Sequence, residues 1–178
     1  MGRLHLRASM ALAACLVAVL AAAGPTAAHD PGSAASPTSA LADVDGRVIS
    51  IDQIPDWYCH DLDFPHIHCF ATATELQRAL ADHVAAAPVG ATASAPYLNI
   101  YDNADWSGAY TAISQPYNDL RTIGWNDRIS SFKALNGVAG HFATDIYNSG
   151  YYYFFCCNQQ TTYVGDAWND TFSSVYPW

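Results

Sequence analysis

A heptapeptide that occurs twice constrains the fold of this chain more than any other feature of its sequence. Trp-Asn-Asp-Arg-Ile-Ser-Ser at 125–131 recurs as Trp-Asn-Asp-Thr-Phe-Ser-Ser at 168–174, an offset of 43 residues. An aromatic segment with a turn glycine, Gly108 or Gly150, precedes each copy. A unit of about 40 residues with short strands cannot bury its apolar face alone. The repeat therefore predicts two Greek-key units, about 97–135 and 140–178, packed as one sandwich.

The composition of this part also favours β structure. The chain contains 11 Tyr and 5 Trp, and aromatic and β-branched residues alternate with turn residues across 97–178. The run Tyr-Tyr-Tyr-Phe-Phe at 151–155 is interpreted as a strand that is buried on both faces. An exposed aromatic strip that binds a sugar or a partner protein is the alternative interpretation.

Residues 1–28 are predicted to be a secretory signal peptide. Two arginines precede an apolar run at 10–23, and small residues that end at Ala28 supply a cleavage site. The run is too short and too rich in alanine to stay in a membrane as a span. It also continues past Cys15, which disfavours a lipidated cysteine. We expect a secreted, extracellular protein without membrane contact after cleavage.

The charge of the mature chain excludes several kinds of partner. Without the first 28 residues, 5 basic residues stand against 16 acidic ones, a net charge of −11. Such a charge disfavours nucleic acid and anionic membranes and suits a cation. All the acidic residues except Glu75 are aspartates, which are common in loops and turns. We expect a monomer with its acidic groups in the loops.

The sequence before the repeats divides into three shorter parts. Residues 29–46, rich in Ala, Ser and Pro, are predicted to be a flexible leader, and 88–96 a linker. Residues 47–87 are predicted to be a small extension with a short strand at 47–54, a cysteine-bounded loop at 59–70 and one helix at 73–86. Thr72 and Glu75 have the spacing of a capping box at the start of that helix.

Four cysteines remain after signal cleavage, an even number in an oxidising compartment. A bond between Cys59 and Cys69 would close a short loop. In the alternative pairing, Cys156 or Cys157 reaches back and joins the extension to the sandwich. His60, His66 and His68 could instead form a zinc or copper cluster with Cys59 and Cys69, but export favours a disulfide loop with surface histidines.

The doubled heptapeptide carries the chemistry. Each copy contains Asn-Asp-x-x-Ser-Ser, whose ligand atoms are all hard oxygens. Ca²⁺ takes six to eight such oxygens in irregular geometry, and two loops brought together by a repeat can share them. A single copy would be explained by an Asx-turn in which Asn and Asp bond to the backbone. Two copies at equivalent positions favour a cation site.

The segment 97–178 resembles the βγ-crystallin family. The first repeat has both the aromatic opening, 97–108, and the closing Asn-Asp-x-x-Ser-Ser signature, whereas the second opening has Ala143 where a hairpin tyrosine is expected. The resemblance implies an all-β fold in which two Greek-key repeats form a βγ-crystallin-type sandwich. A short N-terminal segment with one α-helix precedes it and lies outside the resemblance.

The resemblance also implies a Ca²⁺ site at each signature, built jointly by both repeats. It implies carboxylate ligands, backbone carbonyl ligands, hydroxyl ligands and bracing amides. The carboxylate ligands are Asp127 and Asp170, and the hydroxyl ligands are Ser130 and Ser173. The backbone carbonyl ligands belong to Arg128, Thr171, Asp102 and Thr144. The bracing amides are Asn126 and Asn169. The cation of Arg128 lies near the first site and should weaken it.

Secreted bacterial metalloproteinase inhibitors resemble the same fold. We therefore expect a non-enzymatic Ca²⁺-binding protein that inhibits an extracellular protease. The alternative is a Ca²⁺-stabilised structural or stress protein without inhibitory activity. A hydrolase is a third interpretation with little support, because exported cysteines in even number are normally bonded and leave no thiolate nucleophile.

Overall fold

The computed structural model describes residues 40–86 and 97–178. The predicted signal peptide, the leader up to residue 39 and the linker 88–96 lie outside these residues. The strands in chain order are β1 (Leu41–Val44), β2 (Arg47–Ile49), β3 (Tyr58–Asp63), β4 (His66–Phe70), β5 (Tyr97–Tyr101), β6 (Tyr110–Ile113), β7 (Ser131–Leu135), β8 (Gly140–Asp145), β9 (Ser149–Phe155), β10 (Gln160–Thr161) and β11 (Ser174–Pro177). The helices are α1 (Ala73–Ala86) and the 3-10 helices η1 (Ile51–Asp56), η2 (Ala104–Trp106) and η3 (Leu120–Ile123).

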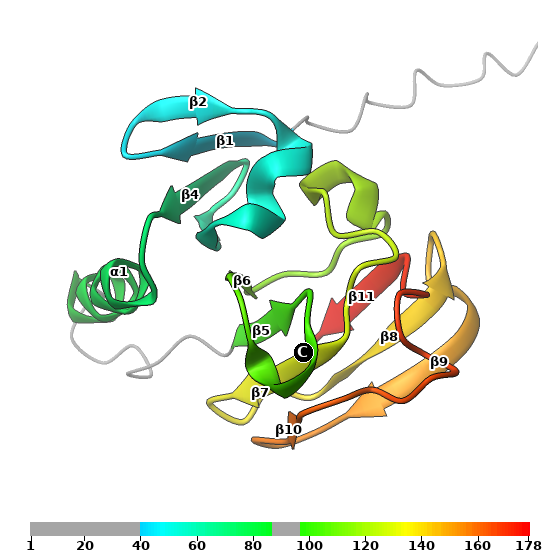
Figure 1. Cartoon of the computed structure of the whole chain (residues 1–178). Helices are drawn as coiled ribbons and strands as arrows, with labels where there is room; N and C mark the ends of the chain where they lie inside the picture. The colour runs from blue at the N-terminus through cyan, green and yellow to red at the C-terminus, as the bar shows by residue number, and fades with distance from the viewer. Residues whose placement is uncertain (1–39, 87–96) are drawn as a thin grey trace, which may run out of the picture. The chain divides into compact units, whose positions relative to one another are not determined.

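The two repeats form the predicted Greek-key sandwich, and each contributes a segment to the sheet of the other (Figure 1). β6, β5 and β7 of the first repeat are neighbours, and β10 of the second repeat pairs with β7. β9, β8 and β11 of the second repeat form the other sheet, and Tyr117 of the first repeat bridges to Val175 in β11. The predicted fold class is confirmed.

Aromatic side chains from both repeats fill the space between the two sheets. Trp125, Phe132, Phe142 and Phe172 are completely buried. The rings of Phe142 and Phe172 stack with centroids 4.7 Å apart, and Phe132 of β7 meets Phe142 of β8 edge-on at 5.3 Å. This core forms only when the two repeats pack together, which agrees with the expectation that neither buries its apolar face alone.

The N-terminal segment contains more β structure than the sequence predicts. Strands β3, β4, β1 and β2 extend the first sheet to eight strands, and β3 pairs with β6 in parallel. The cysteine-bounded loop is a hairpin of β3 and β4, and the end of the predicted leader forms β1. The predicted strand at 47–54 ends at Ile49, before η1. Polar residues occupy both outward and buried positions of these strands, for example the exposed His66 and the buried Asp61, which hid the alternation in the sequence.

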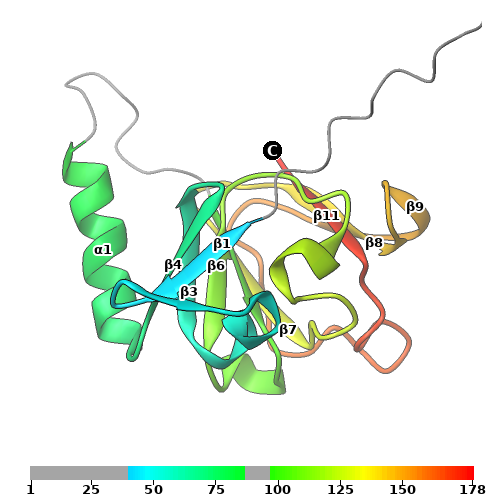
Figure 2. The ribbon, with the colours of Figure 1, turned by 90° about the horizontal axis from the view of Figure 1, so that it is seen from above.

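The predicted helix is confirmed as α1. Thr72 N donates to Glu75 Oε2 at 3.0 Å and Glu75 N donates to Thr72 Oγ1 at 3.3 Å, so the capping box is present. Leu76 and Leu80 are buried against tyrosines of β5 and β6. Figure 2 shows α1 beside β4 and β3. Within the described residues, no helix is both long and apolar enough to span a membrane.

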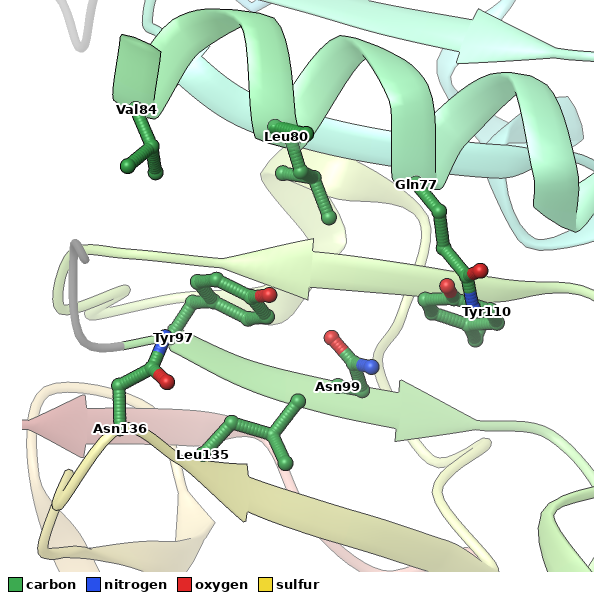
Figure 3. A pocket seen from close by; sticks show the side chains of 9 residues that line it. Gln77, Leu80, Val84, Tyr97, Asn99, Tyr110, Leu135 and Asn136 are labelled. Atoms are coloured by element: carbon green, nitrogen blue, oxygen red, sulfur yellow. The ribbon is translucent and has the colours of Figure 1, made fainter. Parts of the chain in front are cut away.

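A cavity of about 490 Å³ lies between α1 and the sheet. Leu80 and Val84 line it from the helix, and Tyr97 and Asn99 line it from β5 (Figure 3). The apolar stripe of the helix is too narrow to fill the whole space above the sheet. The helix is therefore anchored at Leu76 and Leu80, while its C-terminal end borders the cavity.

A buried carboxylate joins the N-terminal segment to the repeats. Asp61 in β3 is 2% exposed and accepts hydrogen bonds from Ser114 N, Ser114 Oγ and Tyr117 Oη, each at 2.8 Å. Burial raises the pKa of Asp61 and also the pKa of Tyr117. Because both carboxylate oxygens have partners, the cost of burying this group is offset by hydrogen bonds to the first repeat.

The aromatic run at 151–155 is not buried on both faces, so that prediction is wrong. Tyr151 is 77% exposed and Phe154 67%, whereas Phe155 is 3% exposed. The run lies in β9, at the edge of the three-stranded sheet. Phe154 and Phe155 point to opposite faces of the sheet, so only Phe155 packs on the core. Tyr151 has the parity of Phe155 but is exposed, because it lies near the start of the strand, beyond the part that is buried.

The cysteines form two local disulfides. Cys59 and Cys69 face each other across β3 and β4 and are bonded, as predicted. Cys156 and Cys157 are bonded to each other, so the alternative bond to the N-terminal segment is not formed. The second bond lies in a tight turn where Gln159 N donates to Cys156 O at 2.9 Å.

The end of η3 in the first repeat lies close to η1 in the N-terminal segment. Gly124 ends η3 with φ of 72°, and an added Cβ would lie 2.3 Å from Ile51 O in η1. Gly137 also has positive φ, of 81°, but has nothing within 4 Å of an added Cβ.

We expect Gly124→Ala to lower the free energy of unfolding by about 3 kcal/mol, and Gly137→Ala by about 1 kcal/mol, measured by urea denaturation. Both variants bear the cost of a left-handed alanine, about 1 kcal/mol, and only the first must also displace η1. Equal losses for the two variants would contradict the described contact.

Candidate metal centre

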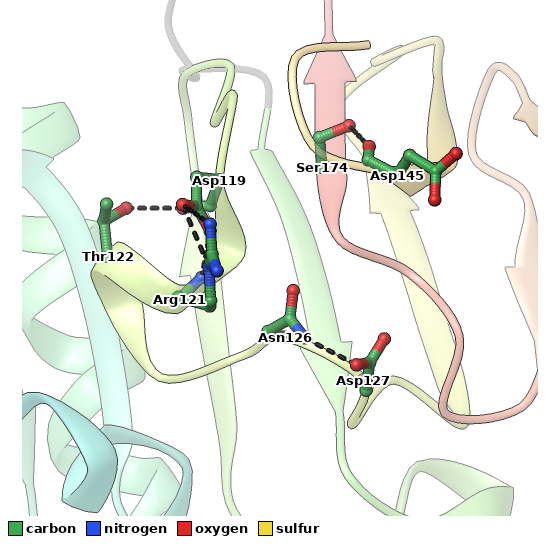
Figure 4. Close-up of polar contacts among 7 residues, drawn as sticks. All are labelled: Asp119, Arg121, Thr122, Asn126, Asp127, Asp145 and Ser174. Carbon is green, nitrogen blue, oxygen red and sulfur yellow. Dashed lines mark hydrogen bonds and ion pairs between the residues drawn. The ribbon is translucent and has the colours of Figure 1, made fainter. Parts of the chain in front are cut away.

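The two signature loops adopt the same backbone and side-chain arrangement. Asp127 and Asp170 each have φ of 54°, in the left-handed region that aspartate and asparagine tolerate better than most residues. Asn126 Nδ2 donates to Asp127 Oδ2 at 2.6 Å (Figure 4), and Asn169 Nδ2 donates to Asp170 Oδ2 at 2.7 Å. The asparagines thus orient the carboxylates, the bracing role that the resemblance implies for them.

Reciprocal backbone hydrogen bonds connect the loops. Asp127 N donates to Phe172 O at 3.0 Å, and Asp170 N donates to Ile129 O at 3.5 Å, the longer of the two. The two donors are equivalent positions of the repeat, as are the two acceptors. Each aspartate therefore lies beside the carbonyl-bearing part of the other signature. This is the arrangement expected if both repeats build each site.

Two of the oxygens predicted for the first site lie together. Ser130 Oγ donates to Asp102 O at 2.8 Å, so a predicted hydroxyl ligand and a predicted carbonyl ligand are within one ligand spacing of each other. The next serine, Ser131, donates to the next hairpin carbonyl, Asn103 O, at 2.5 Å. The signature serines thereby fix the hairpin that carries Asp102.

The second site repeats this arrangement in part. Ser174 Oγ donates to Asp145 O at 2.7 Å (Figure 4), the counterpart of the Ser131 bond. Ser173 N donates to Ala143 O at 2.9 Å, which places Ser173 beside the segment that contains Thr144. Thr171 Oγ1 is turned to Trp168 O at 2.7 Å. Sequence reasoning missed the structural role of Ser131 and Ser174, although the doubled final serine was a visible signal.

Figure 4 also shows a hydrogen-bonded turn before the first signature. Asp119 caps η3 by accepting from Arg121 N at 3.0 Å, and its carboxylate pairs with Arg121 Nη2 at 2.7 Å. Thr122 Oγ1 donates to Asp119 O at 2.6 Å. The turn positions the chain that enters the signature at Trp125, whose Nε1 donates to Thr111 Oγ1 at 2.9 Å.

The residues present fit a hard cation. The candidate donors in both loops are carboxylate, carbonyl and hydroxyl oxygens, the ligands that Ca²⁺ prefers. Asn169 Oδ1 is buried and has no hydrogen-bond partner among the described residues, so the second loop holds an oxygen acceptor whose bonding capacity is unused. An unpaired buried carbonyl is costly, and a nearby cation would lower that cost.

Arg128 distinguishes the first site from the second. Its Nε lies 2.9 Å from Asp102 Oδ1, and both side chains are 33% exposed. These hydrogen bonds raise the pKa of Arg128, which stays cationic. The guanidinium is paired with the carboxylate of Asp102, the residue whose backbone carbonyl is a predicted ligand, and we expect its charge to oppose a bound cation. Thr171 is the neutral counterpart in the second loop.

Among known proteins, only solved structures show similarity to this chain. No protein-family model and no curated protein matches the chain. A solved structure described as "Evolution of the eye lens beta-gamma-crystallin domain fold" is 21% identical, covers 46% of this chain and 84% of its own, and has a TM-score of 0.44. A βγ-crystallin domain from Flavobacterium johnsoniae is 24% identical over 46% of this chain and 92% of its own, with a TM-score of 0.41.

A βγ-crystallin from Ciona intestinalis is 22% identical, covers 46% of this chain and 99% of its own, and has a TM-score of 0.41. These values describe a likeness of fold. The Greek-key topology itself follows from the strand pairing of this chain, including the exchange of β10 and the bridge at Tyr117.

Neutralising Arg128 should raise the Ca²⁺ affinity of the first site. We expect Arg128→Gln to bind Ca²⁺ about fivefold more tightly at that site, corresponding to about 1 kcal/mol for removing a partly exposed like charge. Isothermal titration calorimetry at low ionic strength measures the change. Arg121→Gln removes an equal charge that is paired with Asp119, and serves as the control with unchanged affinity. Unchanged or weaker binding by Arg128→Gln would show that the guanidinium does not oppose the ion.

Proposed function

We propose that this protein is a secreted, non-enzymatic Ca²⁺-binding protein in which each signature loop contributes to two cation sites. The observation that carries the proposal is the reciprocal pairing of the loops, Asp127 N to Phe172 O and Asp170 N to Ile129 O. The pairing brings the backbone of the aspartate in each signature beside a backbone carbonyl of the other. One loop alone would supply too few oxygens for Ca²⁺.

The donor set favours Ca²⁺ over other common cations. Mg²⁺ demands nearly ideal octahedral geometry and keeps most of its water, whereas Ca²⁺ accepts irregular sets of backbone and side-chain oxygens. The described loops offer such a mixed set, for example Ser130 Oγ beside Asp102 O. The net charge of −11 after removal of 1–28 adds a general attraction for cations.

Bound Ca²⁺ should stabilise the folded chain. We expect excess Ca²⁺ to raise the melting temperature relative to EGTA, because the ion binds the native state only, and Mg²⁺ to have a smaller effect. Asp170→Ala should weaken binding at least tenfold, since it removes a charged ligand. Asn169→Ala should weaken it less, since it removes only the brace. Identical melting curves in Ca²⁺ and in EGTA would contradict the proposal.

The proposed extracellular role is inhibition of a metalloproteinase. The hairpin between β3 and β4 has features that suit an inhibitory loop: it presents the 38% exposed Phe64, and the Cys59–Cys69 bond joins its two strands. Phe64 N donates to Asp61 O at 3.0 Å, and Leu41 N donates to Pro65 O at 2.9 Å, which holds the turn. A loop already fixed in one conformation loses little entropy when it enters a protease cleft.

Inhibition should be stoichiometric. We expect the protein to block a thermolysin-like protease at equimolar concentration and to remain intact during incubation, with Ca²⁺ held constant so that the calcium of the protease is not depleted. Phe64→Ala should weaken inhibition about tenfold or more, because it removes the exposed apolar anchor. Val48→Ala, which truncates another exposed apolar residue in β2, is the control that leaves inhibition unchanged.

Two experimental outcomes would favour a function other than protease inhibition. Absence of inhibition across thermolysin-like and serine proteases would favour the alternative, a Ca²⁺-stabilised structural or stress protein. Slow release of product from a substrate, abolished by substituting Cys59 or His60, would instead indicate a hydrolase.

A further inference from the structure

A second group of ligand-capable side chains lies on the N-terminal part of the large sheet. Asp43 of β1 and His66 and His68 of β4 place one ligand atom each within 4.8 Å of the others. Their strand neighbours Ala42, Val44, Ile67 and Cys69 belong to the buried core. Because side chains alternate along a strand, the three ligand-capable residues share the opposite face. The parallel register sets Asp43 directly beside His68.

The distances suit a shared cation. Asp43 Oδ2 lies 3.1 Å from His68 Nδ1, close to the separation of about 3.3 Å between two ligands of a tetrahedral zinc ion. The rings of His66 and His68 are stacked, with centroids 5.9 Å apart. Asp63 Oδ2 lies 3.7 Å from Nε2, the other ring nitrogen of His68. That separation is longer than a hydrogen bond, so Asp63 acts on the site through its negative charge, which attracts a cation.

We propose that Asp43, His66 and His68 bind a Zn²⁺ ion. Two imidazoles and one carboxylate are a nitrogen and oxygen donor set that suits zinc and related transition ions rather than Ca²⁺. Three protein ligands leave a fourth position of a tetrahedral site for water or a ligand from solution. The disulfide between Cys59 and Cys69 excludes both sulfurs from the ligand set.

The surrounding structure supports the site. The Cys59–Cys69 bond fixes β3 against β4, and the next residue pair in register is His60 and His68. The buried ring of His60 lies 5.6 Å from that of His68. Ligands carried by rigid, paired strands keep their geometry better than ligands on loops.

The competing interpretation is an ion pair without a metal. In that case His68 pairs with Asp43 and Asp63 through its two ring nitrogens, and the exposed His66 has no role. The helix α1 also faces these histidines, because His83 of α1 acts electrostatically on His60. The two interpretations differ in what they predict for His66. A metal site requires it, whereas the ion pair does not.

Zinc titration of the purified full chain in competition with a chromophoric chelator tests the proposal. We expect one Zn²⁺ per chain, and at least tenfold weaker binding by His66→Ala and by His68→Ala. Asp63→Asn should weaken zinc binding less than either histidine variant, because it removes a nearby negative charge but no ligand. Co²⁺ in place of Zn²⁺ should give the visible absorption of a four-coordinate ion, and His66→Ala should abolish it.

Matched controls separate this site from other histidines and from the calcium loops. His83→Ala and His141→Ala should bind Zn²⁺ like the parent protein, and saturating Ca²⁺ should leave the zinc affinity unchanged. Circular dichroism confirms that each variant is folded, and His66→Ala is the least demanding because this side chain is exposed. Absence of 1:1 binding at micromolar Zn²⁺, or equal affinity of folded His66→Ala and the parent, would overturn the proposal.

Discussion

The exchange of segments between the two repeats is the constraint on which the rest of the structure depends. β10 of the second repeat completes the sheet of the first, and Tyr117 of the first repeat bridges to β11 of the second. The first sheet is not complete within one repeat, and the aromatic core between the two sheets contains residues of both repeats. The exchange also sets the signature loops against each other, so the candidate calcium sites are a consequence of the way the core is closed.

The N-terminal segment depends on the same sandwich. Its strands add to the free edge at β6, and the carboxylate of Asp61 has its hydrogen-bond partners in the first repeat, at Ser114 and Tyr117. A buried carboxylate without these partners would be strongly destabilising, so the segment is specified by contacts outside itself. In turn, it shields an edge strand that would otherwise be open to pairing with other chains.

The two candidate cation sites illustrate different ways of positioning ligands. In the signature loops, left-handed aspartates and backbone carbonyls offer hard oxygens at the ends of strands, where the backbone is free of ladder hydrogen bonds. In the N-terminal segment, the period of two along β4 puts His66 and His68 on one face, and a parallel neighbour adds Asp43. The first set suits a cation that tolerates irregular geometry, and the second suits one that prefers few, fixed ligands.

The sequence by itself determined the Greek-key repeats, helix 73–86 and the bracing of Asp127 and Asp170, because these depend on local spacing and on a repeat visible as an offset of 43 residues. Only the tertiary structure decided the strands β1, β3 and β4, the exposure of Phe154 and the meeting of Asp43 with His68. Those features depend on which strand becomes a neighbour and which face is covered. Long-range pairing sets both, and a local pattern of residues does not encode it.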